Sequence, residues 1–271
     1  MEVITYATKE TQYYDALNES CKKFNYNLTT LGLGNKWNGM GDKILGVFDF
    51  LKDEGKEDKL YLVVDAYDVI FCRDSKDFIK EFQENFNIED VVFNSEALPK
   101  SYIMKLLWEN NYSNKHPKSD NKYEALNAGV IMGTKDKLIE FYENIINYKD
   151  LRTNTIKSDQ KVIYDLFGKN KISNLKLDNK CKLFTVFTAF NNDIVYKDNK
   201  IYNKYAKTFP FLIHGAGKAT VLNEHIDFLG IKTKCQKSHA KFIFNQYRAD
   251  YLDYLVIIVF LAIFYKIKSS K

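Results

Sequence analysis

Two aspartates three positions apart are the residues of this chain best suited to chemistry. Asp65 and Asp68 follow residues 60–64, an apolar run that reads Leu-Tyr-Leu-Val-Val. Such a run predicts a central strand of a parallel sheet, and in open α/β sheets ligands bind beyond the carboxyl ends of the strands. Carboxylates at this spacing can face one hard cation such as Mg²⁺ or Mn²⁺, which could in turn hold a diphosphate. An acidic turn that caps a helix fits the same pattern, so the pair alone leaves both interpretations open.

A histidine in a glycine-containing turn could complete such a metal site. His214 follows the apolar residues 211–213 and begins the sequence His-Gly-Ala-Gly-Lys, which contains Gly215, Gly217 and Lys218. The glycines permit a close approach of the backbone to a ligand, and Lys218 can meet a phosphate as a point charge. The spacing differs from that of a Walker loop. A glycine turn with an exposed histidine is the alternative.

Polar residues beside a third apolar segment suit sugar hydroxyls. Asn127 and Gly129 lie in the sequence Leu-Asn-Ala-Gly-Val, and Ser158, Asp159 and Gln160 follow about thirty residues later. The alternatives are a turn at the first segment and a helix N-cap at Ser158.

The elements that must position these residues alternate between strand and helix. Strands are predicted at residues 3–7, 28–31, 60–64 and 91–93, and helices at 14–24, 44–51 and 78–86. This rhythm predicts an α/β sheet with helices on both faces. Beyond a polar surface excursion at 100–124, we expect a strand at 128–132, helices at 138–146 and 160–167, a hairpin at 194–202 and a strand at 211–213. No linker divides the chain before residue 232, so residues 1–231 are predicted to form one domain.

Composition excludes several classes of protein. The chain has 271 residues, of which 45% are hydrophobic and 28% charged, so it can bury a sizeable core. Its 40 basic and 35 acidic residues are interleaved and only three of the basic residues are Arg, which argues for a solvated surface and against nucleic-acid binding. The four cysteines form no C-x-x-C pair, which excludes a zinc ribbon and a thioredoxin-like motif.

The C-terminal segment is different in kind. Residues 232–253 are a predicted polar connection, and residues 254–265 form an uninterrupted apolar or aromatic run followed by Lys266, Lys268 and Lys271. As a helix the run would span roughly 18 Å against a hydrocarbon core of about 30 Å. A transmembrane helix that anchors the tail in a thin membrane, an interfacial segment, and a buried terminal strand or helix all remain open, and the position favours the membrane. The first residues include no basic or apolar leader, so we expect no cleavable signal peptide and an otherwise cytoplasmic protein.

Taken in order, these segments resemble the glycosyltransferase domain of the procollagen lysyl hydroxylases and the related collagen glycosyltransferases. The resemblance covers about residues 2–231. The matching residues are Thr5 to Lys9, Phe24 to Tyr26, Leu31, Gly32, Trp37, Lys43, Asp65, Tyr67 to Phe71, Val92, Phe93, Glu96, Pro99, Leu126, Asn127, Gly129, Leu177, Asp178, Lys180 to Lys182, Phe184, His214, Gly215 and Gly217.

The resemblance implies a GT-A fold, a Rossmann-like nucleotide-sugar-binding domain with a mixed central sheet that binds a UDP-sugar with Mn²⁺. It implies Asp65, Asp68 and His214 as metal ligands. The residues that it implies on the nucleotide side are Trp37 and Tyr67 flanking the uridine, with Lys43, Gly215, Gly217 and Lys218. Those that it implies on the sugar and acceptor side are Asn127, Gly129 and Gln160, with Asp159 and Glu96 as candidate catalytic groups.

We therefore expect a metal-dependent hexosyltransferase that uses UDP-galactose or UDP-glucose. Its acceptor would be a protein or glycan hydroxyl, with hydroxylysine or galactosyl-hydroxylysine of a collagen-like chain as one candidate. The chain departs from the family pattern at Leu98 and Ser158, positions that face the sugar or acceptor, which leaves both substrates open. A catalytically inactive, membrane-tethered UDP- or glycan-binding module is one alternative, and a metal-dependent phosphohydrolase or nucleotidyltransferase is another.

Overall fold

The computed structural model describes most of the chain. The described residues are 1–57, 59–98, 102–103, 105–106, 121–151, 156–169, 172, 174–187, 193–216, 219–233, 254 and 256–263.

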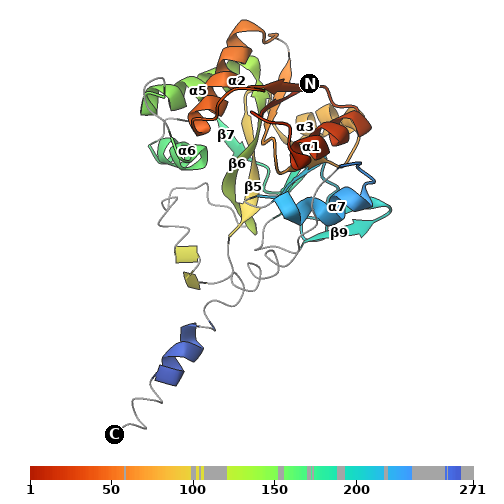
Figure 1. Cartoon of the computed structure of the whole chain (residues 1–271), viewed down its shortest axis with the longest axis vertical. Coiled ribbons are helices and arrows are strands. Elements are labelled where there is room, and N and C mark those ends of the chain that lie inside the picture. Colours follow the sequence, from red (N-terminus) through yellow and green to blue (C-terminus); the bar gives the residue numbers. More distant parts are fainter. Residues whose placement is uncertain are drawn as a thin grey trace.

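A six-stranded mixed sheet forms the centre of the molecule (Figure 1). Its strands lie in the order β2-β1-β3-β6-β5-β7, and β6 runs antiparallel to both of its neighbours. The strands are β1 (Glu2–Tyr6), β2 (Leu28–Leu31), β3 (Leu60–Val64), β5 (Val91–Ala97), β6 (Tyr123–Thr134) and β7 (Leu175–Leu177). The expected α/β class with a mixed central sheet is confirmed.

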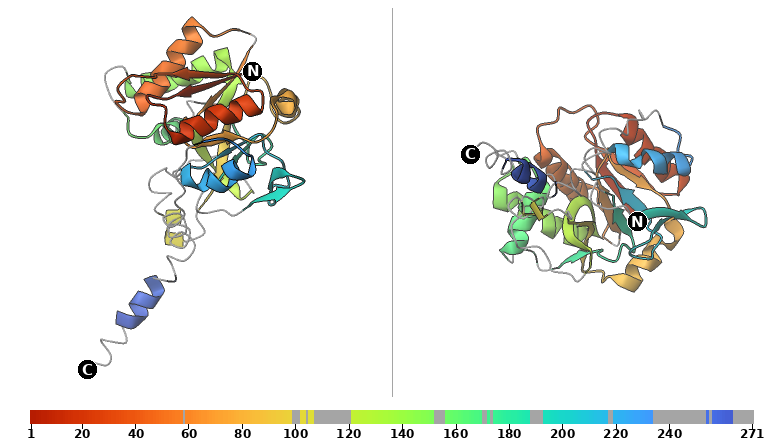
Figure 2. Two further views of the ribbon diagram at one scale, coloured as in Figure 1. Left: turned by 45° about the vertical axis from the view of Figure 1, so that its right-hand side comes forward. Right: turned by 90° about the horizontal axis from the view of Figure 1, so that it is seen from below.

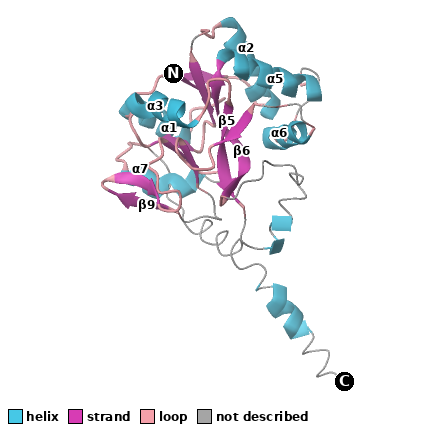
Figure 3. Cartoon of the chain, turned by 180° about the vertical axis from the view of Figure 1, so that it is seen from behind, coloured by secondary structure: helices cyan, strands magenta, loops and turns pink. Residues whose placement is uncertain are grey.

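Helices cover both faces of this sheet (Figures 1 and 3). One face carries α2 (Met40–Asp53), α5 (Lys135–Lys149) and α6 (Asp159–Gly168), and the other carries α1 (Gln12–Lys23) and α3 (Phe78–Asn85). The side chains of β3 alternate between the two cores: Tyr61 and Val63 face the first, whereas Leu62 and Val64 face the second. Burial on both sides explains why this strand is a continuous apolar run.

A second, three-stranded sheet extends the core on the side of α1 and α3. It contains β4 (Val69–Phe71), β11 (Leu212–His214) and β8 (Phe184–Val186), in that order. Beside it lie the hairpin of β9 (Ile194–Lys197) and β10 (Lys200–Asn203), the 3₁₀ helix η2 (Ala219–Leu222) and α7 (Asn223–Phe228) (Figure 2). The hairpin turns at Asp198 and Asn199, which have φ of 51° and 55°. Asp and Asn tolerate this left-handed conformation, and the predicted hairpin is confirmed.

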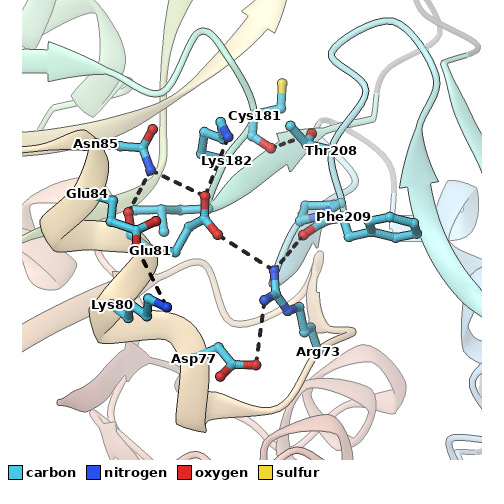
Figure 4. Close-up of polar contacts among 12 residues, drawn as sticks. Arg73, Asp77, Lys80, Glu81, Glu84, Asn85, Cys181, Lys182, Thr208 and Phe209 are labelled. Atoms are coloured by element: carbon cyan, nitrogen blue, oxygen red, sulfur yellow. Dashed lines mark hydrogen bonds and ion pairs between the residues drawn. The ribbon is translucent and has the colours of Figure 1, made fainter.

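Arg73 ties the segment after β4 to the neighbouring elements (Figure 4). Its Nη1 donates to the carbonyl oxygen of Phe209 at 3.2 Å, its Nη2 lies 3.6 Å from a carboxylate oxygen of Asp77, and its guanidinium lies 4.0 Å from the ring centroid of Phe211. The contacts join β4, the 3₁₀ helix η1 (Ser75–Asp77) and the residues that precede β11. They help to hold β4, and therefore Asp68 before it, against β11.

The structure extends two predicted strands and adds others. The strand predicted at 91–93 continues to Ala97, and the strand predicted at 128–132 spans Tyr123–Thr134. The added part of β5 contains the polar residues Asn94, Ser95 and Glu96, which pair with residues 125–127 of β6. Periodicity also gave no sign of β4, β7 and β8, which have three residues each.

The described part of the C-terminal apolar segment, Tyr254 and residues 256–263, is helical. Most of its large apolar side chains are exposed, from 51% for Ile263 to 68% for Phe260. Among the described residues, no helix combines the length and the apolar character needed to cross a membrane. The polar connection predicted at 232–253 and the excursion predicted at 100–124 lie mostly outside the described residues.

Candidate metal centre and adjoining cavity

Three side chains from two segments converge beyond the carboxyl end of β3: Asp65 and Asp68 from the connection between β3 and β4, and His214 from β11. Nε2 of His214 lies 3.4 Å from Oδ2 of Asp68 and 3.8 Å from Oδ2 of Asp65. One ligand atom from each residue lies within 4.8 Å of the others. The set therefore offers two oxygens and one nitrogen to a single point, as the sequence predicted.

Strand pairing brings these residues together. In the antiparallel pair of β4 and β11, His214 lies opposite Val69, and the N–H of Gly215 donates to the carbonyl oxygen of Asp68 at 2.7 Å. Asp65 is held from the other sheet, since its N–H donates to the carbonyl oxygen of Gly129 on β6 at 2.8 Å. The site therefore lies where the two sheets meet, and no single sequence motif contains it.

A bulge in β6 makes room for the imidazole. Phe93 of β5 pairs with Ile131, but the next residue, Asn94, pairs with Asn127, so residues 128–130 of β6 have no partner on β5. Two side chains accept hydrogen bonds from backbone N–H groups of the bulge. Oδ1 of Asn127 accepts from the N–H of Gly129 at 2.9 Å, and Oε1 of Gln160 accepts from the N–H of residue 128 at 3.2 Å.

Gly129 lies directly against the histidine ring. A Cβ atom on Gly129 would stand 2.1 Å from Cε1 of His214 and 2.7 Å from each ring nitrogen. Any side chain at this position would therefore collide with the imidazole.

The electrostatics of His214 fit a cation. The residue is buried, and Nε2 has no hydrogen-bond partner among the described residues. Burial by itself lowers the pKa of His214, but the carboxylates of Asp68, Asp65 and Glu96 outweigh it and raise the pKa above its usual value. The carboxylates thus favour positive charge at this point, and a divalent cation among Asp65, Asp68 and His214 would supply it. Oxygen and imidazole ligands suit Mn²⁺ and similar metals.

Lys43 of α2 lies buried behind the metal centre. Its Nζ lies 2.5 Å from Oδ1 of Asp65 and 3.5 Å from Oδ2 of Asp159. Burial lowers the pKa of Lys43, yet the two carboxylates outweigh it and raise the pKa well above its usual value. Lys43 is therefore a fixed positive charge that links Asp65 to the first residue of α6. Ser158 is the N-cap of that helix, as the simpler interpretation of the sequence expected.

A cavity of about 680 Å³ adjoins the metal centre. Aromatic side chains line it: Trp37 is 44% exposed and lies 6.0 Å from Tyr6 between ring centroids. The Tyr6 ring lies so close to Gly32 and Gly46 that a Cβ on either would stand 2.4 or 2.6 Å from it. Tyr67 is fixed by its hydroxyl, which donates to the carbonyl oxygen of Lys9 at 3.0 Å and accepts from the N–H of Lys9 at 3.2 Å.

Glu96 lies among amide side chains on the other side of the centre. Nδ2 of Asn127 donates to Oε2 of Glu96 at 3.0 Å, and Nε2 of Gln160 donates to Oε1 at 3.4 Å. The two candidate catalytic carboxylates therefore differ in their surroundings: Asp159 contacts the buried cation of Lys43, whereas Glu96 accepts from the neutral amides of Asn127 and Gln160.

Most predicted site residues lie at or beside this centre. Gly217 and Lys218 lie outside the described residues. Gly215 packs against η2, because a Cβ there would stand 2.8 Å from Val221. Sequence reasoning did not select Tyr6 or Asn94, which is buried next to His214. One feature of the sequence could have selected Asn94: its amide side chain comes directly after the three apolar residues of a predicted strand, 91–93.

Comparisons with known proteins give the same family as the sequence motifs. Residues 1–237 match the family model described as the PLOD GT domain. An uncharacterized protein of Acanthamoeba polyphaga mimivirus is 28% identical over 217 residues, which are 76% of this chain and 44% of that protein. The multifunctional procollagen lysine hydroxylase and glycosyltransferase of Caenorhabditis elegans is 28% identical over 247 residues, 84% of this chain and 31% of that protein.

The chain thus spans less than half the length of these two relatives. Among solved structures, an active-site mutant of LgtC is similar with a TM-score of 0.49 and 14% identity, and the match covers 89% of this chain and 99% of that one. This distant likeness carries no inference about the site.

Proposed function

The chain belongs to the family of PLOD glycosyltransferase domains, and we propose that it is a metal-dependent hexosyltransferase. The observation that carries the proposal is the convergence of Asp65, Asp68 and His214 beside an aromatic-lined cavity that both aspartates line. Family membership supports glycosyl transfer, and the donor set supports Mn²⁺ as the cation.

The cavity suits a UDP-sugar, with UDP-galactose or UDP-glucose as the proposed donor. Tyr6, Trp37 and Tyr67 present aromatic surface on which a uracil ring could stack. Asp65 and Asp68 line the same cavity, so a cation held by them would lie next to a diphosphate bound there.

Each of the chain's own groups has a proposed part in the transfer. A bound cation would act as a Lewis acid that offsets the charge developing on the UDP leaving group. Lys43 orients Asp65 toward that cation through their contact of 2.5 Å. In this proposal Glu96 would accept the proton of an acceptor hydroxyl, and its hydrogen bonds from Asn127 and Gln160, which fix its carboxylate, support this role. The acceptors to test first are hydroxylysine and galactosyl-hydroxylysine in collagen-like peptides, followed by other protein and glycan hydroxyls.

UDP release from a panel of UDP-sugars, with and without Mn²⁺, tests the proposal. We expect slow Mn²⁺-dependent hydrolysis of one donor, and its loss in Asp68→Asn. Asp53→Asn, which changes an exposed carboxylate at the end of α2, is the matched control and should behave like the wild type. UDP binding without turnover of any donor or acceptor would favour a binding module, and cleavage of nucleoside triphosphates without preference for UDP-sugars would favour a phosphohydrolase or nucleotidyltransferase.

We also propose that the C-terminal apolar segment attaches the protein to a membrane. The support is the exposure of its described apolar side chains together with the following Lys266, Lys268 and Lys271, which suit anionic headgroups. The full chain should sediment with anionic lipid vesicles, and a chain truncated after Asp250 should stay in the supernatant. Equal behaviour of the two chains would contradict this proposal and leave the transferase proposal untouched.

A further inference from the structure

A buried amide lies behind the metal-facing histidine. Asn94 of β5 is fully buried, and its Nδ2 lies 3.2 Å from Nδ1 of His214. Among the described residues, Asn94 Oδ1 and His214 Nε2 are both buried without a hydrogen-bond partner. We infer that Asn94 is a positioning residue, whose side-chain amide selects the imidazole tautomer that offers Nε2 to the cation. The inference rests on the metal site proposed above.

A neutral imidazole carries one proton, on either Nδ1 or Nε2. A histidine that binds a metal through Nε2 must present a lone pair there, so its ring proton lies on Nδ1. An Nδ1–H donor needs an acceptor, and metal-binding histidines generally find one in a carboxylate, carbonyl or water. At this Nδ1 the neighbouring group is the amide of Asn94.

The orientation of that amide decides the tautomer. With Nδ2 of Asn94 toward the ring, Nδ1 must accept, and the ring proton lies on Nε2, which faces Oδ2 of Asp68 at 3.4 Å. Rotating the Asn94 amide by half a turn brings Oδ1 to the position that Nδ2 occupied, facing Nδ1 of His214. Nδ1–H then donates to Oδ1, and the lone pair of Nε2 faces Asp65 and Asp68. The two ends of an amide are nearly equal in size, so this exchange needs little space.

The His214 ring itself has little room to move when the metal binds. Gly129 lies against it so closely that a Cβ would stand 2.1 Å from Cε1. We therefore assign the adjustment to the amide of Asn94 and not to a movement of His214.

Mn²⁺ titration of the metal-free full chain tests the inference on binding alone. Asn94→Leu removes the acceptor with little change in volume and should weaken Mn²⁺ binding about 10- to 100-fold, the usual cost of losing such a partner. Asn94→Asp restores an acceptor for Nδ1–H and should bind within a few-fold of the wild type. Ser95→Ala is the control, because the Ser95 hydroxyl donates to the carbonyl oxygen of Asp178 at 2.9 Å, away from the site. Thermal unfolding checks that each variant is folded.

A second measurement needs no variant of Asn94. In ¹⁵N-imidazole NMR with diamagnetic Mg²⁺ or Zn²⁺, the His214 signals should change to the Nδ1–H tautomer as the metal binds. His214→Gln identifies these signals among the four histidines of the chain.

The outcomes separate the inference from the function on which it rests. A wild-type chain that binds no Mn²⁺ would overturn the metal site itself. Mn²⁺ binding with wild-type affinity by Asn94→Leu, or equally weak binding by Asn94→Asp, would overturn the role of Asn94 and leave the metal site standing. An Nε2–H tautomer in the metal-bound wild type would overturn both the role of Asn94 and the assignment of His214 as a ligand through Nε2.

Discussion

Replacement of Gly129 by alanine tests whether this residue serves the metal centre or only a substrate. The new Cβ would stand 2.1 Å from Cε1 of His214. Non-bonded carbon atoms are comfortable at about 3.5–4.0 Å, so the ring or the strand must move by roughly 1.5 Å. The backbone of Gly129 lies outside the left-handed region, so the expected effect comes from this collision and not from backbone strain.

The displacement is large compared with the tolerance of a metal site. Ligand distances in such sites hold to within about 0.2 Å, so a ring displaced by roughly 1.5 Å no longer provides Nε2. We expect Mn²⁺ affinity to fall at least about tenfold, and overpacking to cost about 1–3 kcal/mol of unfolding free energy. Mn²⁺ titration and urea unfolding measure the two effects. Gly133→Ala on the same strand is the control, because its nearest neighbour would be the flexible Leu138 side chain at 3.3 Å.

Two results would refute this reasoning about Gly129. One is wild-type Mn²⁺ affinity in a folded Gly129→Ala variant. The other is unchanged metal binding with a raised KM for the sugar donor, which would show that the residue contacts the substrate alone.

Three further predictions concern Lys43 and Glu96 at the site and the buried His225 on α7. Lys43→Met removes the cation between Asp65 and Asp159 and should lower stability by about 1–3 kcal/mol as well as weaken Mn²⁺ binding; an unchanged urea midpoint would contradict the role of the ion pair. Glu96→Gln should reduce sugar transfer about 10²- to 10⁴-fold with UDP and Mn²⁺ binding little changed, whereas the same pattern in Asp159→Asn alone would transfer the role of base to Asp159. Burial lowers the pKa of His225 to about 4, so the unfolded chain binds the proton more readily and stability should fall as the pH drops from 6.5 through 4. The loss is on the order of 3 kcal/mol, and His225→Gln should flatten this part of a pH–stability profile; an equally steep profile would contradict the assignment.

The sequence predicted the longer elements of the fold because their apolar residues follow simple patterns. In α2, Ile44, Val47, Phe48 and Leu51 are buried as their helical spacing indicates. The run in β3 is buried on both faces, as its continuous apolar character indicates. Strands such as β4 and β8 were missed because three residues are too few to show a period.

The candidate site was predicted residue by residue, but its geometry was not. The spacing of Asp65 and Asp68 could not reveal that β4 pairs with β11 and so places Asp68 beside His214. Nor could hydropathy reveal the bulge of β6, because a register shift is a property of two strands and not of one. The close contact between Gly129 and the His214 ring depends on both the pairing of β4 with β11 and the bulge of β6.

The charges of the site support the proposed role of a cation. Asp65 and Asp68 line the cavity that would receive an anionic diphosphate, so alone they would repel it. Lys43 cannot resolve the conflict, because its charge is already shared between Asp65 and Asp159. His214 cannot both hold a proton on Nε2 and coordinate a metal there. A divalent cation at this point would bind both carboxylates and replace that proton while leaving coordination positions for phosphate oxygens. The two carboxylates at this end of the cavity therefore favour joint binding of the metal and the nucleotide in the proposed transfer.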